Sequence, residues 1–457
     1  MKKILICFYI GHVLVAFGCR SEKNQSEVMG ENVAKDAAET MGTEESGIQR
    51  TKHPEAQWFP DGSFGLFMHW GIHSVAGIQP SWAMIKGYPH GGNPDFHPPE
   101  KYFALAEQFN PQRYDPDKWM AAAKAAGMQY VVLTTKHHDG YTLWPSEHGQ
   151  YTTTNYMNGR DLLKPYVEAC RKHGLKVGFY FSPRDWSYPG YPVADVDFDH
   201  AKRSQFLAIT DSVENQQAFD AFYAYTRGQL EELLTNYGEI DVLWFDGINW
   251  PGVDNLKSAE TIRWIRELQP GILINDRWGG KGDFETVEWR FAEEQPEDKW
   301  WEYCISWKGH WGYDPEAEFR DVAWVLEMLA KARAWGGNFL LNIGPAPDGT
   351  MPDGYYARLD SIADWMEHSS ISVIEAHPLP NPAAASVPAT RQGETWYLHC
   401  IGEDSATASI SGVENPQKVW LLRTGETVPF EYEGETLSIY LSEKMRTPLD
   451  NVVGITW

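Results

Sequence analysis

Two adjacent histidines and an aspartate follow one apolar segment of this 457-residue chain. The segment Tyr130 to Thr135 leads through Lys136 into His137, His138 and Asp139. In a parallel α/β barrel the strand body packs in the core, whereas the residues at its C-terminal end face a ligand. The two imidazole rings and the Asp139 carboxylate would then lie at such a strand end. The alternative is that one ring only contacts a neighbouring loop, because adjacent side chains of an extended segment point to opposite faces.

A carboxylate ends a second apolar segment. Val242 to Phe245 leads directly into Asp246, and a charge at the end of such a strand is costly unless it is used or paired. Asp246 is therefore a candidate functional residue, with the capping of the next loop as its alternative. Glu285 and Glu288 in a downstream loop, or Glu302 beyond it, could supply a second carboxylate. Cleavage of a glycosidic bond requires one nucleophilic and one acidic carboxylate, and spacing alone leaves the choice of glutamate open.

A fixed cation and several possible metal ligands complete the candidate residues. Arg277, in Asn275-Asp-Arg-Trp278, could orient a carboxylate, bind hydroxyl groups or pair with Asp276. His69 and His73 join the later imidazoles as possible metal ligands, but no pair has the His-Glu-x-x-His spacing of a helical zinc site. We therefore expect neither a catalytic metal nor a cofactor. No Gly-x-Gly-x-x-Gly follows the first predicted strand, which also argues against a dinucleotide.

These candidates belong to a repeating pattern of short apolar segments and helices. Continuous rather than alternating hydrophobicity indicates strands that are buried on both faces, as in a parallel sheet. The predicted strands are Phe64–His69, Tyr130–Thr135, Lys176–Phe181, Asp241–Asp246, Gly271–Asp276 and Asn338–Gly344. The predicted helices are Asp115–Ala126, Leu162–His173, Phe219–Asn236, Ser258–Leu268 and Asp321–Trp335. The first two end before Gly127 and Gly174, where left-handed caps are expected. Repeated βα units predict a parallel barrel or a doubly wound sheet.

The composition changes beyond about residue 376. Several prolines and an alanine run form a linker, and short segments rich in strand-forming residues follow, such as Thr395–Cys400. They predict a small antiparallel β-sandwich over residues 377–457. The catalytic barrel would then span residues 53–376.

The first residues of the chain are typical of an export signal. A basic start, a short apolar run and Ala16-Phe-Gly-Cys19 resemble a bacterial lipoprotein signal over residues 1–19. Cys19 would then carry the lipid, the alternative being plain signal-peptidase cleavage nearby. Residues 20–52 are polar and predict a disordered tether. We therefore expect an exported bacterial protein that is periplasmic or held at the outer membrane or cell surface as a lipoprotein.

Charge and aromatic content restrict the possible partners. The formal net charge of -24 and the pI near 5.0 argue against nucleic acid and against anionic membrane surfaces. Any contact with a membrane would then be through a lipid on Cys19. The chain also contains 21 Trp and 22 Tyr residues. This excess suits carbohydrate, because the apolar C–H faces of sugars stack on aromatic rings.

Six segments together resemble the α-L-fucosidases of glycoside hydrolase family 29. They occur in the family's order and are Phe64–Val75, Tyr114–Trp119, Thr134–Gly140, Leu243–Gly247, Asn275–Gly279 and Asn338–Pro345. The resemblance implies an α/β fold, with a (β/α)8-like TIM barrel followed by a small C-terminal antiparallel β-sandwich. It also implies a retaining exo-glycosidase that hydrolyses terminal α-L-fucosides of an oligosaccharide or glycoconjugate through a covalent glycosyl-enzyme intermediate.

The same resemblance implies roles for single residues. Asp246 matches the family's nucleophile, and Glu288 fits its acid/base best, with Glu302 in reserve. The residues that would contact the sugar are His69, Trp82, His137, His138, Tyr180, Trp244 and Arg277.

One position departs from the family pattern. Many members have Glu-Trp-Tyr where this chain has Ser81-Trp82-Ala83, so a carboxylate that helps to bind ring hydroxyls is missing. Either the pocket accepts a related sugar such as α-L-galactose, or another segment supplies the acceptor. A carbohydrate-binding protein without turnover is a further alternative, although Asp246 and the available glutamates favour an enzyme. Linkage, aglycone and oligomeric state are left open by the sequence.

Overall fold

The computed structural model describes residues 50–85, 94–189, 213–246, 257–279, 282–292, 295–296, 299–402 and 406–457. The expected export signal, Cys19 and residues 20–49 of the expected tether lie outside these residues. Arg50 and Thr51, which the sequence assigns to the tether, contact the barrel. The Arg50 guanidinium lies 4.6 Å from the centre of the Trp300 ring, and the Thr51 N–H donates to Asp283. Within the described residues, we find no helix with both the length and the apolar character needed to span a bilayer.

Eight parallel strands form the larger sheet, in the order β5-β4-β3-β2-β1-β8-β7-β6. Their bounds are β1 Phe64–Met68, β2 Tyr130–Lys136, β3 Lys176–Phe181, β4 Val242–Phe245, β5 Leu273–Ile274, β6 Glu285–Glu288, β7 Trp301–Ser306 and β8 Asn338–Ile343. Most strands are buried along their whole length, which explains their continuous hydrophobicity. A parallel bridge between Asn275 and Phe284 connects the two outer strands, β5 and β6. The sheet therefore closes on itself, and the expected (β/α)8-like barrel is confirmed.

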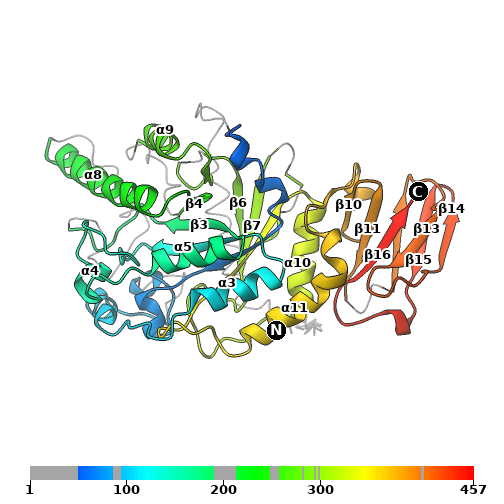
Figure 1. Ribbon diagram of the computed structural model, residues 1–457, viewed down its shortest axis with the longest axis horizontal. Helices are drawn as coiled ribbons and strands as arrows, with labels where there is room; N and C mark the ends of the chain where they lie inside the picture. Colours follow the sequence, from blue (N-terminus) through cyan, green and yellow to red (C-terminus); the bar gives the residue numbers. More distant parts are fainter. Residues whose placement is uncertain are drawn as a thin grey trace, which may run out of the picture.

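Helices cover the outside of this sheet (Figure 1). The α-helices are α2 Pro99–Phe103, α3 Pro116–Ala125, α4 Thr153–Tyr156, α5 Leu163–Lys172, α8 Val213–Asn236, α9 Ser258–Leu268, α10 Val322–Ala334 and α11 Tyr355–Ser369. The short 3-10 helices are η2 Pro54–Ala56, η3 Phe59–Asp61, η4 Ile72–Val75, η5 Trp82–Met84, η6 Ala104–Glu107, η8 Ser370–Ser372, η9 Pro382–Ala384 and η10 Glu443–Met445. The side chain of Asp115 caps α3 and that of Asp321 caps α10. Gly127 and Gly174 have φ of +82° and +65°, so the left-handed caps after α3 and α5 are confirmed.

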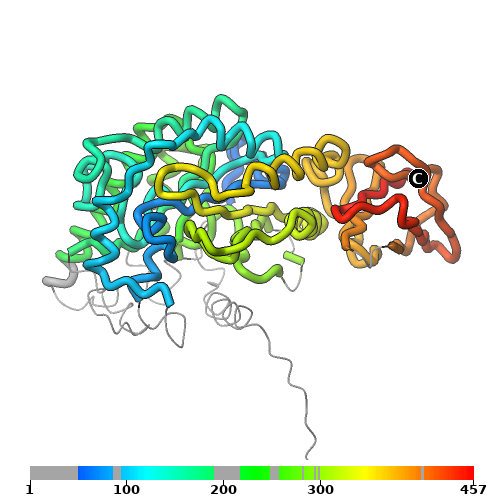
Figure 2. Tube along the Cα trace, turned by 90° about the horizontal axis from the view of Figure 1, so that it is seen from below, coloured from blue at the N-terminus to red at the C-terminus, as the bar shows by residue number. Residues whose placement is uncertain are grey.

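Two antiparallel sheets form the C-terminal part. One has the order β13-β16-β11-β10-β9, and the other β12-β15-β14. Their bounds are β9 His377–Pro378, β10 Ala389–Gln392, β11 Thr395–Cys400, β12 Thr407–Ser411, β13 Lys418–Leu421, β14 Phe430–Glu433, β15 Thr436–Tyr440 and β16 Asn451–Thr456. The sheets enclose a core of their own, as expected for a β-sandwich. Both views place this sandwich at one end of the molecule, beside α10 and α11 (Figures 1 and 2).

Aromatic side chains fill the barrel interior. Phe67, Tyr130, Tyr180 and Trp244 belong to one buried cluster with aliphatic residues of the neighbouring strands. Gly65 makes room for this layer, because a Cβ atom there would lie 2.5 Å from the Tyr130 ring. Polar residues follow at the carboxyl ends of the same strands, so the aromatic layer lies directly under them.

Candidate active site

The carboxyl-terminal ends of neighbouring strands carry the candidate residues. His69 follows β1, His137 and His138 follow β2, and Asp246 follows β4, while Tyr180 lies near the end of β3. The four strands are consecutive in the sheet and parallel. Their polar ends therefore meet on one face of the barrel, the face on which α/β barrels bind ligands.

Asp246 is bound from two sides. Its Oδ2 accepts a hydrogen bond from the Tyr180 hydroxyl at 2.8 Å, and its Oδ1 accepts one from Arg277 Nη1 at 3.1 Å. The Nε2 atom of His138 lies 3.8 Å from Oδ2. The side chain is 21% exposed. The carboxylate is thus held in one orientation while one part of it is accessible from the barrel face.

Arg277 connects Asp246 to a second carboxylate. It belongs to the loop after β5, and its Nη2 donates to Oε2 of Glu288 at 2.5 Å. Its Nε donates to the Thr286 hydroxyl at 2.8 Å, which fixes the plane of the guanidinium. Glu288 ends β6, and its side chain is 20% exposed. The two carboxylates therefore lie on either side of a single guanidinium, an arrangement that suits paired carboxylates in glycoside hydrolysis.

The surroundings push the pKa values of the two carboxyl groups apart. Burial raises both, but the charge of Arg277, with help from His137 and the Tyr180 hydrogen bond, brings the pKa of Asp246 below its usual value. Burial prevails at Glu288 despite Arg277, and the negative charge of Asp246 adds to it, so the pKa of Glu288 lies above its usual value. Asp246 is therefore the more readily ionised group, and Glu288 is the better proton donor.

The sequence assigned Glu285 and Glu288 to a loop, and that assignment is wrong because they begin and end β6. Residues three apart in a strand point to opposite faces. Glu285 accordingly pairs with Lys299 at 2.5 Å, whereas Glu288 points to Arg277. Glu302, the reserve acid/base, is fully buried in β7 with both carboxylate oxygens bound inside the barrel. It is therefore out of reach of a leaving group on the barrel face.

The three histidines of the site are each fixed through Nδ1. Their Nδ1 partners are Asn342 Oδ1 for His69, the Ser81 hydroxyl for His137 and the Ser182 hydroxyl for His138, at 2.7, 2.6 and 2.6 Å. Burial lowers the pKa of His69 to about 4 and holds the pKa of His137 well below its usual value. These two rings are therefore neutral at neutral pH, and a neutral ring with Nδ1 engaged offers Nε2 to a sugar hydroxyl.

Both adjacent histidines belong to the site, although neighbours in a regular strand point to opposite faces. The register of β2 against β3 shifts between Thr134 and Lys136, just before them. Such an irregularity changes the direction of the side chains that follow. His137 consequently stacks on Tyr180, with ring centroids 5.4 Å apart and planes 3° apart, and His138 approaches Asp246.

Ser81 and Trp82 lie at the edge of the site. The Ser81 hydroxyl lies 3.2 Å from Oδ2 of Asp139, and the Tyr102 hydroxyl donates to the same oxygen at 2.7 Å. A carboxylate thus lies next to the position where the family pattern has glutamate, but it already accepts hydrogen bonds inside the protein. Burial raises the pKa of Asp139 to about 6. Trp82 meets His138 edge to face, with centroids 5.5 Å apart.

The described residues include one group of possible metal ligands. It consists of His137, His138 and Asp246, whose donor atoms lie within 4.8 Å of one another. The separation of 3.8 Å between His138 Nε2 and Asp246 Oδ2 would give an angle of ~130° at a metal with bonds of about 2.1 Å. This angle matches neither the tetrahedral angle nor the cis or trans angle of octahedral geometry. A hydroxyl oxygen at hydrogen-bond distance, about 2.8 Å from each atom, fits the spacing better.

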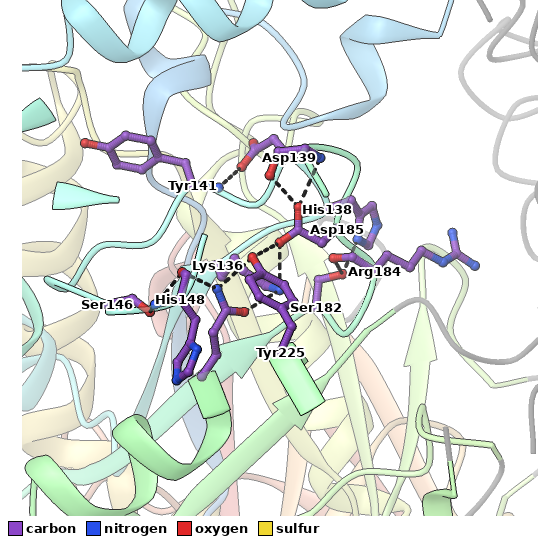
Figure 3. Close-up of polar contacts among 12 residues, drawn as sticks. Lys136, His138, Asp139, Tyr141, Ser146, His148, Ser182, Arg184, Asp185 and Tyr225 are labelled. Atoms are coloured by element: carbon purple, nitrogen blue, oxygen red, sulfur yellow. Dashed lines mark hydrogen bonds and ion pairs between the residues drawn. The ribbon is translucent and has the colours of Figure 1, made fainter. Parts of the chain in front are cut away.

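A buried ion pair supports the loops that carry these residues (Figure 3). Lys136 Nζ lies 3.3 Å from Oδ2 of Asp185, and both side chains are 0% exposed. Tyr225 donates to the same carboxylate at 2.5 Å, and Gln229 accepts from Lys136 at 2.9 Å. Lys136 immediately precedes the two histidines, Asp185 follows β3, and the other two residues belong to α8. The network therefore fixes two strand ends against one helix.

Polar residues that follow β3 also belong to the site, although the expected site residues do not include them. Ser182 orients His138, and Arg184 is buried and contributes to the lowered pKa of Asp246. The segment Ser182-Pro-Arg-Asp185 comes directly after an apolar strand. The rule that identified the histidines and Asp246 would have identified this segment as well.

Comparison with known proteins gives one consistent family. The family model described as alpha-L-fucosidase matches residues 29–370. Tissue alpha-L-fucosidase of Mus musculus is 28% identical over 71% of this chain and 72% of its own length, and plasma alpha-L-fucosidase of Rattus norvegicus is 30% identical over 76% and 75%. Alpha-L-fucosidase isoenzyme 1 from Paenibacillus thiaminolyticus has a TM-score of 0.73 at 30% identity, covering 88% of this chain and 98% of that one. An alpha-L-fucosidase GH29 from Bacteroides thetaiotaomicron, trapped as a covalent intermediate with 2-fluoro-fucosyl fluoride, has a TM-score of 0.74 at 26% identity, covering 90% and 98%.

Replacing Lys136 by Met tests the supporting network. The substitution leaves Asp185 as an uncompensated buried charge, so we expect a loss of about 3–5 kcal/mol in the free energy of unfolding, measured by chemical denaturation. Lys172→Met is the matched control, because Lys172 pairs with Asp117 at the surface, where the two side chains are 63% and 51% exposed. The control should unfold at the wild-type midpoint. Equal midpoints for all three proteins would show that the network contributes nothing to stability.

Proposed function

The chain belongs to the alpha-L-fucosidase family, and on that basis we propose that Asp246 is its nucleophile and Glu288 its general acid and base. It is a glycoside hydrolase that releases terminal α-L-fucose with retention of configuration, and its substrate is a fucosylated glycan. The observation that supports the residue assignment is the shared guanidinium, since Arg277 donates to both carboxylates.

In the first step, an Asp246 oxygen attacks the anomeric carbon and forms an ester bond as the glycosidic C–O bond breaks. Glu288 gives its proton to the departing oxygen, which leaves as a hydroxyl group. Asp246 suits the first role because its pKa is lowered, and Glu288 suits the second because its pKa is raised.

In the second step, Glu288 carries the negative charge that Asp246 carried in the first. The Asp246 ester is neutral, so the negative charge that had raised the pKa of Glu288 is gone, while the Arg277 contact at 2.5 Å still favours the ionised form. Glu288 now takes a proton from water, whose oxygen attacks the anomeric carbon and restores the Asp246 carboxylate. One negative charge thus faces one guanidinium in both halves of the reaction.

The sugar would bind against neutral imidazoles and aromatic rings. His69, His137 and His138 offer directional hydrogen-bonding atoms to hydroxyl groups, and Tyr180 and Trp244 stack beneath them with centroids 5.5 Å apart. The net charge of -24 supports a neutral glycan rather than a nucleic acid as the partner.

Replacing Asp246 by Ala should lower kcat for an aryl α-L-fucoside by at least about a thousandfold, because the variant cannot form the ester. Binding of free fucose should remain measurable by calorimetry. Asp241→Ala is the matched control, because Asp241 lies at the opposite end of the same strand and pairs with Lys176. It should keep the wild-type kcat. A variant lacking Asp246 that turns over at the wild-type rate would remove this residue from the mechanism.

The Glu288→Gln variant separates the two proposed roles in the same assay. An aryl leaving group of low pKa needs little protonation, whereas a sugar leaving group needs a proton from the acid. We expect Glu288→Gln to lose about 10²–10⁴-fold in kcat/KM on a fucosylated oligosaccharide and far less on the activated aryl fucoside. An equal loss on both substrates would contradict the role of Glu288 as the acid.

We further propose that the protein is exported and held at a bacterial membrane by a lipid on Cys19. The basic and apolar first residues and the Ala16-Phe-Gly-Cys19 sequence support this location. Cys19→Ala should move the protein from the detergent-extracted membrane fraction to the soluble fraction on cell lysis. An unchanged distribution between the fractions would contradict the anchor.

A further inference from the structure

Glu302 is a buried carboxyl group that the reaction does not use. It lies in β7, is 0% exposed, and both of its oxygens accept hydrogen bonds. The Tyr130 hydroxyl donates to Oε2 at 2.5 Å, and the Trp244 indole N–H donates to Oε1 at 2.9 Å. Burial of a carboxyl group costs free energy unless its oxygens are hydrogen-bonded. The bonds from Tyr130 and Trp244 meet this requirement for Glu302.

Trp244 connects Glu302 to the reacting groups. The indole stacks on Tyr180, with centroids 5.5 Å apart and planes 16° apart. The guanidinium of Arg277 lies 4.8 Å from the centre of the same indole. Tyr180 and Arg277 both hydrogen-bond to Asp246. A rotation of the indole would therefore displace both groups that hold the nucleophile.

We infer that Glu302 is a positioning residue, which fixes the Trp244 indole and through it places Arg277 and Tyr180 against Asp246. This inference rests on the proposed roles of Asp246 and Arg277. Arg277 also donates to Glu288, so one indole determines the geometry of both catalytic carboxylates. Glu302 itself touches neither substrate nor reacting atoms.

The partners of Glu302 allow it to act in either protonation state. Burial raises the pKa of Glu302 to about 7. The Tyr130 hydroxyl can donate to the carboxylate or accept from the carboxylic acid, so the bond to Trp244 is kept in both states. Gln in place of Glu302 keeps a carbonyl oxygen for the indole and presents its amide N–H groups to Tyr130. Leu has a similar size but cannot accept the indole N–H.

The test compares Glu302→Leu with Glu302→Gln in kinetics on an aryl α-L-fucoside across pH. Displacement of Arg277 and Tyr180 in Glu302→Leu should lower kcat by about 10- to 100-fold with little change in KM. It should also move the acidic limb of kcat/KM to higher pH, because Asp246 loses the groups that lower its pKa. Glu302→Gln should keep both quantities close to wild type, with kcat within about threefold.

His399→Leu is the control for general destabilisation. His399 is 0% exposed and pairs with Asp450 at 2.6 Å in the C-terminal sandwich, away from the barrel face. It should lower the melting temperature and leave kcat and the acidic limb unchanged. If Glu302→Leu does not fold, Trp244→Phe removes only the N–H donor and part of the ring, and the same shift of the acidic limb is expected.

Two results would overturn the inference. In one, Glu302→Leu behaves like His399→Leu, with a lower melting temperature but wild-type kcat and acidic limb. In the other, Glu302→Gln is as impaired as Glu302→Leu although it keeps the acceptor for Trp244. Failure of the proposed function is a separate result, because it would appear as wild-type turnover in Asp246→Ala whatever the Glu302 variants do.

Discussion

One guanidinium between two carboxyl groups is the constraint on which the rest of the site depends. Arg277 donates to Asp246 and to Glu288, and a single positive charge in a largely buried site favours a single negative charge opposite it. Two ionised carboxylates would repel each other there, and two protonated ones would leave the cation unpaired. The site therefore favours one ionised and one protonated group, and the surroundings determine which is which. Formation of the glycosyl ester exchanges the two states without changing the net charge.

Barrel closure produces this arrangement. Asp246 ends β4, Arg277 follows β5 and Glu288 ends β6, and the bridge between Asn275 and Phe284 connects the last two strands. The bridge brings the segment after β5 beside β6, so that the Arg277 guanidinium donates to Glu288 as well as to Asp246. Beneath the site, aromatic residues of the barrel interior form a buried cluster that contacts the histidines of the site. The geometry of the site is thus a consequence of the packing of the strand interiors rather than of the loops alone.

Residues at the C-terminal ends of barrel strands face the ligand. This rule predicts much of the site from the sequence. Continuous apolar segments predict β1 to β5 and β8, and the polar residues after them include His69, His137, His138 and Asp246. The sequence does not predict β6, because Glu285-Thr-Val-Glu288 is polar at both ends, and Glu288 therefore falls in a predicted loop although it ends a strand. The sequence also leaves Glu302 as a possible acid, because its burial inside the barrel depends on tertiary packing, which spacing in the sequence does not encode. The Lys136–Asp185 pair was missed for the same reason, since its members are 49 residues apart and meet only when β2 and β3 pair.

The pH dependence of kcat/KM for the wild type and the Glu288→Gln variant, on a fucosylated oligosaccharide whose leaving group needs a proton, tests most directly whether the two carboxyl groups hold opposite protonation states. Turnover needs Asp246 ionised, so the acidic limb falls as pH decreases through a pKa below the usual aspartate value. It also needs Glu288 protonated, so the alkaline limb falls as pH increases through a pKa above the usual glutamate value. We predict that Glu288→Gln loses the alkaline limb and keeps the acidic one. A variant profile with both limbs still present would contradict the assignment of the two carboxylates.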